Sequence, residues 1–362
     1  MVRSTIALAA ALLVATLLPG TAGATVDSDG WDRRGLPVGD GAQVLVGNFG
    51  GDEADDLLIY RPGPGADAIW YGREGVRGTS RWVKRPLDIR GTYQPIVGDF
   101  VGGSRPDILW YAPGAARDYL WPSTNTWDAL GGDRQKVLVN GRYRWAVLHD
   151  HRGGKDDIAW VGLGDEHDYV WHYDDSGNGS HFDKTVSADG AYELTAGDFD
   201  GNGYDDLFLY APGPKHDEIW RSSTVGTVSR TTLLLNNRYR LAPITRPGPD
   251  DLLLISATGG HSTLWRGGSK PFSSAVGLGT YADNPTPTPF GTEHALLYGP
   301  QAQELRFLDT STTVGDEALS AEGPDQTDQV PAIGDFDHDG NLDIAWYSPG
   351  SSTDSIWYAP SA

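Results

Sequence analysis

The chain repeats one pattern seven times, and this periodicity constrains its fold more than any other feature. Each copy starts with an apolar run, usually behind an aspartate, passes a turn that is usually rich in Gly or Pro, and ends in a second apolar run, which closes on Trp in six copies and on Phe307 in the most divergent one. The copies start at Asp56, Asp107, Asp157, Asp206, Asp251, Ala295 and Asp343. The spacing ranges from 51 residues (56 to 107) down to 44 (251 to 295), which suits a four-stranded propeller blade.

Each copy is expected to be made of strands. The residues after the starting aspartate are aliphatic, β-branched or aromatic, turns interrupt them, and no helical period is present. A further strand is expected upstream of each copy, as at residues 93–98 and 192–197, and a fourth between copies, as at residues 81–89. The sequence therefore predicts an all-β fold: a seven-bladed β-propeller of four-stranded antiparallel blades.

The two ends of the chain carry complementary parts of one blade. Residues 30–49 align without a gap with residues 81–100, pairing Trp31 with Trp82, so the chain begins with a fourth strand. The last copy stops after Trp357, where its own fourth strand should begin. We therefore expect the N-terminal strand to close the last blade and leave no open sheet edge, in one domain of residues 25–362.

Two segments that precede a copy, residues 198–206 and 335–343, present oxygen side chains at alternate positions. The expected side-chain ligands are Asp198, Asp200, Asn202 and Asp206 in one loop and Asp335, Asp337, Asp339 and Asp343 in the other. Tyr204 and Asn341 can add a backbone carbonyl, and Gly203 and Gly340 permit the sharp turn. Six to eight hard oxygens suit Ca²⁺, whereas Mg²⁺ keeps more of its waters. The alternative is a Gly- and Asp-rich turn without an ion.

The corresponding segments of the other copies have lost part of this pattern. Residues 48–56 keep Asn48, Asp52 and Asp56 but place Gly50 at the third position, so ion binding there is left open. Residues 99–107 keep only their end carboxylates, residues 149–157 have histidines at the first and third positions, and the loops before Asp251 and Ala295 are shortened. We expect these segments to bind nothing.

The loop of Asp-Phe-Asp-Gly-Asn-Gly type, together with its repetition, resembles the FG-GAP/VCBS repeat. This repeat is the unit of the integrin α-chain head propeller and of many secreted bacterial proteins. The resemblance covers essentially the whole chain after residue 24 and implies structural calcium at the two intact loops. Members of the family include adhesion modules, lectin-like modules and some polysaccharide-active enzymes, so the resemblance leaves function open.

The recurrent aromatic and acidic residues have two interpretations each. Tryptophans at one strand position, such as Trp70 and Trp171, could stack on sugars, but packing between blades is favoured. The aspartates before them, such as Asp67, are expected to hold turns as hydrogen-bond acceptors. The histidines between His149 and His181 could supply a base or a transition-metal site, but a scattered surface cluster is favoured. No catalytic motif is recognised.

The N-terminal residues have the pattern of a targeting segment. Arg3 precedes an apolar run at residues 6–18, and the small residues 22–24 follow. This pattern predicts a signal peptide over residues 1–24 and a secreted, extracellular protein, and the run is short for a membrane anchor. The amino-acid usage hints at a bacterial source.

The net charge and the composition disfavour some classes of binding partner and exclude some kinds of chemistry. The formal net charge of −21 disfavours nucleic acid and anionic membranes, and the absence of cysteine excludes disulfides and thiol catalysis. We expect no membrane insertion and a monomer. Three functions remain: multivalent recognition of an extracellular polysaccharide, binding of a cell-surface protein as an adhesive module, or a polysaccharide lyase or hydrolase.

Overall fold

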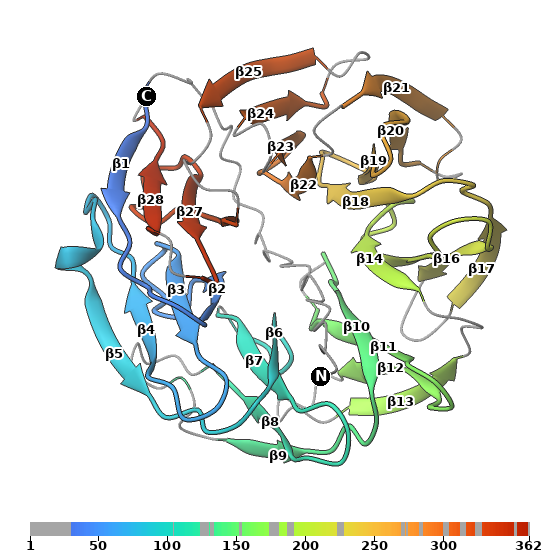
Figure 1. Ribbon diagram of the computed structural model, residues 1–362. Coiled ribbons are helices and arrows are strands. Elements are labelled where there is room, and N and C mark those ends of the chain that lie inside the picture. The colour runs from blue at the N-terminus through green and yellow to red at the C-terminus, as the bar shows by residue number, and fades with distance from the viewer. Residues whose placement is uncertain are drawn as a thin grey trace, which may run out of the picture.

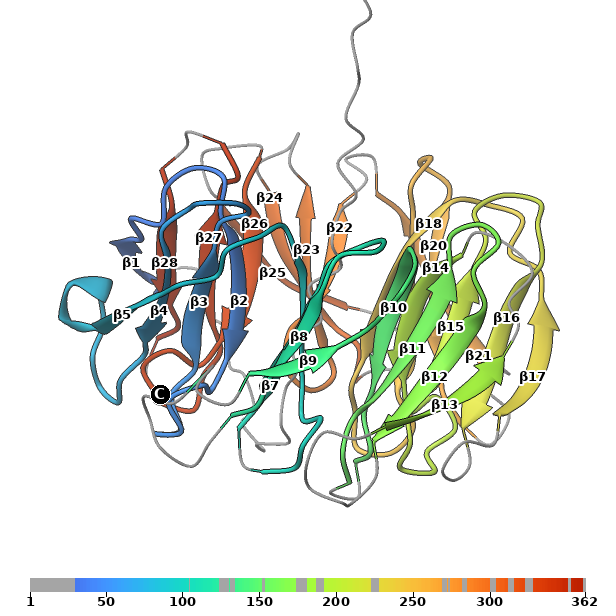
Figure 2. The same ribbon diagram turned by 90° about the horizontal axis from the view of Figure 1, so that it is seen from below.

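Seven four-stranded antiparallel sheets stand in a ring (Figure 1), and the seven-bladed propeller expected from the repeat is confirmed. The structure is a computed structural model that describes residues 30–103, 105–123, 130, 134–151, 154–173, 181–186, 192–222, 228–268, 272, 274–281, 285–299, 304–311, 316–322, 328–350 and 353–360. The expected signal peptide, residues 1–24, lies outside the described residues. Figure 2 shows the blades from the side.

Four concentric sets of strands build the ring, and blades 1 to 7 are numbered here by their innermost strands in chain order. The innermost strands are β2 (Gln43–Gly47), β6 (Gln94–Gly98), β10 (Tyr143–Leu148), β14 (Glu193–Gly197), β18 (Tyr239–Ile244), β22 (Thr286–Pro289) and β26 (Val330–Gly334). The second strands are β3 (Asp56–Tyr60), β7 (Asp107–Tyr111), β11 (Asp157–Gly162), β15 (Asp206–Tyr210), β19 (Asp251–Ser256), β23 (His294–Gly299) and β27 (Asp343–Tyr347).

The third and fourth strands complete each blade toward the rim. The third strands are β4 (Asp67–Tyr71), β8 (Asp118–Trp121), β12 (Asp168–Tyr173), β16 (Asp217–Ser222), β20 (His261–Arg266), β24 (Glu304–Asp309) and β28 (Ser355–Tyr358). The outermost strands are β5 (Val83–Leu87), β9 (Gln135–Val137), β13 (His181–Val186), β17 (Val228–Leu233), β21 (Ser274–Thr280), β25 (Asp316–Glu322) and β1 (Asp32–Gly35). A short 3₁₀ turn, η1 (Thr79–Arg81), lies between β4 and β5.

Strand β1 closes the last blade, as the alignment of residues 30–49 predicts. It pairs antiparallel with β28, with Asp32 opposite Tyr358 and Gly35 opposite Ser355. The buried Trp31 stacks on Phe307 of blade 6, with 6.1 Å between ring centroids and 10° between the planes. The first residues of the described chain therefore join blade 7 and cover part of the junction between blades 6 and 7.

The core lies between the blades. Each of the seven hydrophobic clusters of the described chain combines side chains of two neighbouring blades. Second strands such as β3 and β7 are buried at every residue because both of their faces meet another blade, which explains their continuous apolar runs. Outermost strands such as β5 are largely exposed.

The recurrent tryptophans pack in this core, so the packing interpretation is confirmed. Trp70, Trp121, Trp171, Trp220 and Trp357 are all buried. In several blades the outermost strand also places a cation over the ring, as Lys84 Nζ lies 3.6 Å from the centroid of Trp70. The aspartates before them hold turns as expected, since Asp67 accepts the backbone N–H groups of Arg61 and Ile89.

Candidate metal centres and a candidate ligand pocket

The loop between β14 and β15 folds around the side chain of Asp198. Its carboxylate accepts the backbone N–H groups of Gly201, Asn202 and Gly203 at 2.8, 2.9 and 2.8 Å. Gly203 has a φ of 88°, a conformation that glycine adopts without strain. The loop 198–206 thus forms the tight turn that its sequence predicts.

The loop between β26 and β27 is built in the same way around Asp335. The Asp335 carboxylate accepts the N–H groups of Asp339 and Gly340 at 3.1 and 3.0 Å. One ligand oxygen each of Asp335, Asp337 and Asp343 lies within 4.8 Å of the others. The structure therefore brings together three of the predicted ligands of this loop. The ligand oxygens of Asp198, Asp200 and Asp206 do not form such a group within 4.8 Å of one another.

Three buried carboxylate oxygens in these two loops have no hydrogen-bond partner. They are Asp200 Oδ1, Asp206 Oδ2 and Asp337 Oδ1, and no other buried carboxylate oxygen in the described part of the chain shares this state. A buried charged acceptor without a hydrogen-bond partner lowers the stability of the folded state, so these oxygens are suited to coordinate a cation. Hard carboxylate oxygens are the donors that Ca²⁺ prefers.

The charge of the loops leads to the same conclusion. Burial, reinforced by the nearby charges of Asp200 and Asp198, raises the pKa of Asp206 to about 8. Burial, together with the charges of Asp337 and Asp335, raises the pKa of Asp343 to about 9. Since ionised carboxylates are disfavoured in both loops, a bound cation would stabilise them.

The remaining predicted ligands make contacts within the loops. Asn202 Oδ1 accepts the N–H of Tyr204 at 2.9 Å, and Asn202 Nδ2 donates to the carbonyl of Ser222 at 2.6 Å. Asp339 Oδ1 accepts the backbone N–H and the side-chain amide of Asn341. The roles of Asn202, Tyr204, Asp339 and Asn341 as ligands stay predictions.

Arg77 is a residue of the Asp335 loop that sequence reasoning missed. It comes from the connection between β4 and β5 of blade 1, and its Nε lies 2.7 Å from Asp337 Oδ2. Its guanidinium also contacts Asp339 at 3.0 Å and donates to the carbonyl of Ala359 at 2.8 Å. The Arg77 guanidinium therefore neutralises one side of the loop and ties blade 1 to blade 7. No local sequence signal marks this arginine.

The degenerate loops satisfy their carboxylates with protein groups. Asp157 Oδ2 lies 2.7 Å from His172 Nδ1, and Asp251 is paired with Arg246 and Arg266. In the loop left open by the sequence, Asn48 accepts the N–H of Gly51, and Asp56 accepts those of Gly50 and Gly72. Protein groups thus contact carboxylates of these loops, and ion binding at residues 48–56 stays an open prediction.

Two of the clustered histidines lie at the junctions between blades, where His149 is half-buried and His151 is exposed, and each is paired with an aspartate. His149 Nδ1 lies 2.8 Å from Asp156 Oδ1, and His151 Nε2 lies 2.8 Å from Asp205 Oδ1. Although burial opposes protonation, Asp156 and the more distant Asp205 and Asp250 raise the pKa of His149 to about 9. The side chain of His181 lies outside the described residues.

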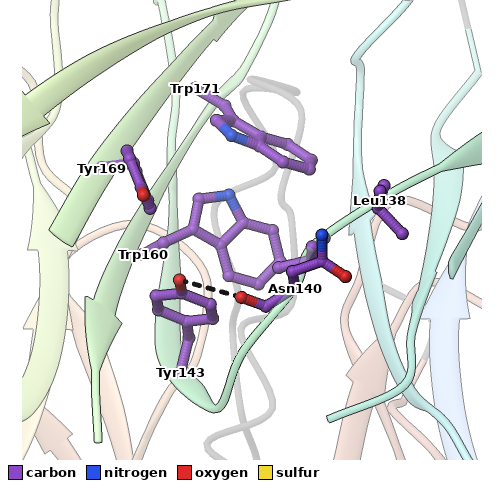
Figure 3. Close-up of a pocket in the computed structure, with 7 residues that line it drawn as sticks. Leu138, Asn140, Tyr143, Trp160, Tyr169 and Trp171 are labelled. Carbon is purple, nitrogen blue, oxygen red and sulfur yellow. Dashed lines mark hydrogen bonds between the residues drawn. The ribbon is translucent and has the colours of Figure 1, made fainter. Parts of the chain in front are cut away.

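A pocket of about 160 Å³ opens between blades 2 and 3 (Figure 3), and no pattern in the sequence predicts it. Trp160, Trp171, Tyr143 and Tyr169 form an aromatic wall, and Leu138, Val139 and Asn140 come from the connection between β9 and β10. The Trp160 and Trp171 rings meet edge to face at 5.1 Å. Trp160 Nε1 is buried without a hydrogen-bond partner.

The repeat that contains the Asp198 loop matches the model of a known family. Residues 190–228 match the model of the FG-GAP repeat. The resemblance inferred from the loop motif is therefore confirmed, and the seven-bladed ring agrees with it. No curated protein matches the chain by sequence.

Several solved propellers share the fold. Virginiamycin B lyase from Staphylococcus aureus, solved with quinupristin, is 13% identical at a TM-score of 0.53, and the match covers 91% of this chain and 99% of that chain. The Cps50 (Swd1) propeller of Myceliophteria thermophila is 13% identical at a TM-score of 0.55, covering 93% and 100%. An Agrocybe aegerita lectin specific for non-reducing terminal N-acetylglucosamine is 14% identical at a TM-score of 0.51, covering 88% and 80%. At these identities the likeness shows the fold alone.

Within the described residues, no helix has the length and apolar character needed to cross a bilayer.

Proposed function

We propose that this protein is a secreted, calcium-stabilised β-propeller that binds an extracellular carbohydrate. The observation that carries the binding function is the aromatic pocket between blades 2 and 3, where the half-buried Tyr169 and the exposed Asn140 reach the surface while Trp160 and Trp171 are buried packing residues. The face of Tyr169 can stack on the apolar face of a sugar ring. The exposed amide of Asn140 at the pocket edge offers both a donor and an acceptor.

Multivalent binding is part of the proposal, and a related but buried aromatic group recurs between blades 1 and 2. Trp110 meets Trp121 at 5.2 Å edge to face, and Tyr93 lies 6.0 Å from Trp110, as Tyr143 lies 5.8 Å from Trp160. Weak sites held on one rigid ring gain avidity for a ligand that repeats.

Calcium has a structural role in this proposal. Asp200, Asp206 and Asp337 contribute the unpartnered oxygens, and Asp335 and Asp343 would complete the site in blade 7. The ion would hold each loop in its bound shape by neutralising carboxylates that otherwise repel one another.

The test is a glycan array followed by titration with the selected polymer and with its monosaccharide. Asn140→Ala and Tyr169→Ala should weaken binding to the polymer about tenfold or more, because they remove polar and stacking contacts at the pocket. Asn236→Ala is the matched control, since Asn236 is the exposed counterpart of Asn140 in the connection between β17 and β18. The junction beyond it has Leu254 and Thr263 in place of Trp160 and Tyr169, so this variant should bind normally.

Two results would contradict the proposal. One is an array without any glycan bound in millimolar calcium, and the other is equal loss of binding in Asn140→Ala and Asn236→Ala. Release of reducing ends or unsaturated uronates from a polysaccharide would instead favour the lyase or hydrolase alternative.

A protein ligand is the second candidate, and exposed leucines favour it. Leu138, Leu163 and Leu234 expose 61%, 44% and 51% of their surface. Leu163 lies in a connection that follows a second strand, and Leu138 and Leu234 lie in connections that follow outermost strands. These two kinds of connection meet on one face of the ring, as the backbone bridge between Gly114 and Gly141 shows. Capture of an envelope protein that is lost in Leu138→Ser and Leu234→Ser, without any glycan binding, would favour this function.

A further inference from the structure

One cluster of metal-ligating side chains uses none of the predicted calcium ligands and shares only Asp205 with the loop 198–206. It combines His151 of blade 3, Asp205 of blade 4 and Asp250 of blade 5, and one ligand atom of each lies within 4.8 Å of the others. The three loops that carry them follow the neighbouring inner strands β10, β14 and β18 (Figure 1). Residues 54 and 45 positions apart in the chain thus meet where three blades converge.

Backbone hydrogen bonds hold the two carboxylates in place. Asp205 Oδ2 accepts the N–H of His149 at 3.0 Å, which leaves Oδ1 2.8 Å from His151 Nε2. Asp250 Oδ2 accepts the N–H of Asp198 at 3.1 Å, and its Oδ1 has only a long contact of 3.4 Å with the N–H of Arg246. A cation would therefore bind in place of the contact between Asp205 Oδ1 and His151 Nε2, and Asp250 would offer the oxygen that has only the long contact.

Backbone contacts also hold His151 in place. The N–H of His151 donates to the carbonyl of Gly203 at 3.0 Å, and Asp150 forms a bridge with Tyr204. The loop of blade 3 is thereby fastened to the loop of blade 4 on both sides of the imidazole. Such preorganisation is a property of sites that bind a ligand without rearrangement.

Burial and charge make this cluster unlike an ordinary surface group. Asp205 and Asp250 are 4% and 5% exposed, whereas the His151 side chain is 39% exposed and faces the solvent side. With the neighbouring His149 and Asp156 included, three buried carboxylates face two imidazoles, so one negative charge is left without a cationic partner. A divalent cation that enters past His151 would balance the cluster.

We propose that His151, Asp205 and Asp250 bind a divalent transition-metal ion, for which zinc fits the donor set. One imidazole nitrogen with two carboxylates is a set that zinc accepts, whereas calcium and magnesium prefer oxygen ligands only. Three protein ligands leave a coordination position for water or another ligand. The three ligands differ from the predicted calcium ligands, although Asp205 lies in the loop 198–206 and Asp250 contacts the backbone of Asp198. The site does not depend on the carbohydrate function.

The site is specific to one junction of the ring. In the loops of blades 2, 4 and 7, the position of His151 is taken by Val101, Asp200 and Asp337. The nitrogen donor is therefore present only between blades 3, 4 and 5 among these loops, and one zinc ion per chain is expected.

The experiment uses the untagged full chain, stripped of metal and then returned to millimolar calcium. Wild-type protein should bind one equivalent of zinc in equilibrium dialysis, and cobalt in its place should give visible absorption bands of a protein-bound ion. His151→Ala should lose this equivalent, with an affinity at least about tenfold lower. His167→Ala, an exposed histidine of the same blade, should bind as wild type does.

Asp250→Asn provides a second test because the amide oxygen can still accept the N–H of Asp198 while the charge is lost. It should fold and should bind zinc as weakly as His151→Ala does. Equal zinc stoichiometry and equal cobalt spectra in wild type and His151→Ala would overturn the proposal. Displacement of the zinc by millimolar calcium would overturn it as well.

Discussion

Asp55 and Asp335 hold the first and last blades together through two backbone contacts. The Asp55 N–H donates to the carbonyl of Asp335 at 2.9 Å, and Asp55 Oδ2 accepts the N–H of Asp335 at 2.9 Å. The same pair of bonds joins Asp156 to Asp99, Asp205 to His149 and Asp250 to Asp198. The aspartate before a second strand is thus a repeated clamp between neighbouring blades.

Removing the Asp55 side chain should weaken ring closure. Asp55→Ala leaves the N–H of Asp335 without its partner, which costs about 1–3 kcal/mol. Asp55→Asn keeps an acceptor oxygen and should lose less than about 1 kcal/mol. Chemical denaturation measures both changes, with the exposed Asp40→Ala as a control that should change nothing. Equal stability of Asp55→Ala and wild type would refute the clamp.

The N-terminal strand should be essential for stability. Trp31→Ala removes a buried ring that contacts Phe307 and Trp357, and we expect a loss of about 3–5 kcal/mol. A chain that begins at Gly41 lacks β1 altogether and should aggregate, because β28 becomes an open edge. Val83→Ala on the exposed strand β5 is the control, and it should cost about 0.5 kcal/mol or less. A monomeric truncated chain with an unchanged melting temperature would contradict this prediction.

Chelation of calcium should lower the melting temperature. A ligand that binds only the folded state at a hundredfold excess over its Kd stabilises it by about 2.7 kcal/mol per site. Asp200→Ala and Asp337→Ala should each remove about one of two bound ions, measured by metal analysis after dialysis. Asp88→Ala, on the exposed side of blade 1, should keep both. Wild-type protein that binds no calcium at millimolar concentration would exclude the structural role.

The chelated protein should become less stable as pH rises from 4 to 7. Burial raises the pKa of Asp107 in blade 2 to about 6, above its ordinary value of 3.8. The folded state therefore binds a proton more tightly than the unfolded state, and this stability is lost as pH rises through 6. The shift corresponds to about 3 kcal/mol for this group. Urea unfolding at several pH values should show a flatter dependence in Asp107→Asn than in wild type, whereas Asp88→Asn should keep the wild-type slope.

The amino-acid sequence by itself determined the blades. Short apolar runs, turn residues and the repeated aspartates are local signals, so they predict the strands, the turn-holding role of Asp67 and the fold of the loops at Asp198 and Asp335. The match of residues 30–49 to 81–100 also predicted ring closure, because a missing fourth strand is visible as a gap in the repeat.

Only the tertiary structure decided which residues meet between blades. Arg77 reaches Asp337 across 260 positions, and His151 meets Asp205 and Asp250 from three different blades. Trp160 and Leu138 line one pocket because neighbouring blades pack face to face. These contacts depend on the spacing and rotation of blades around the ring, and a local pattern carries no information about the partner on the next blade.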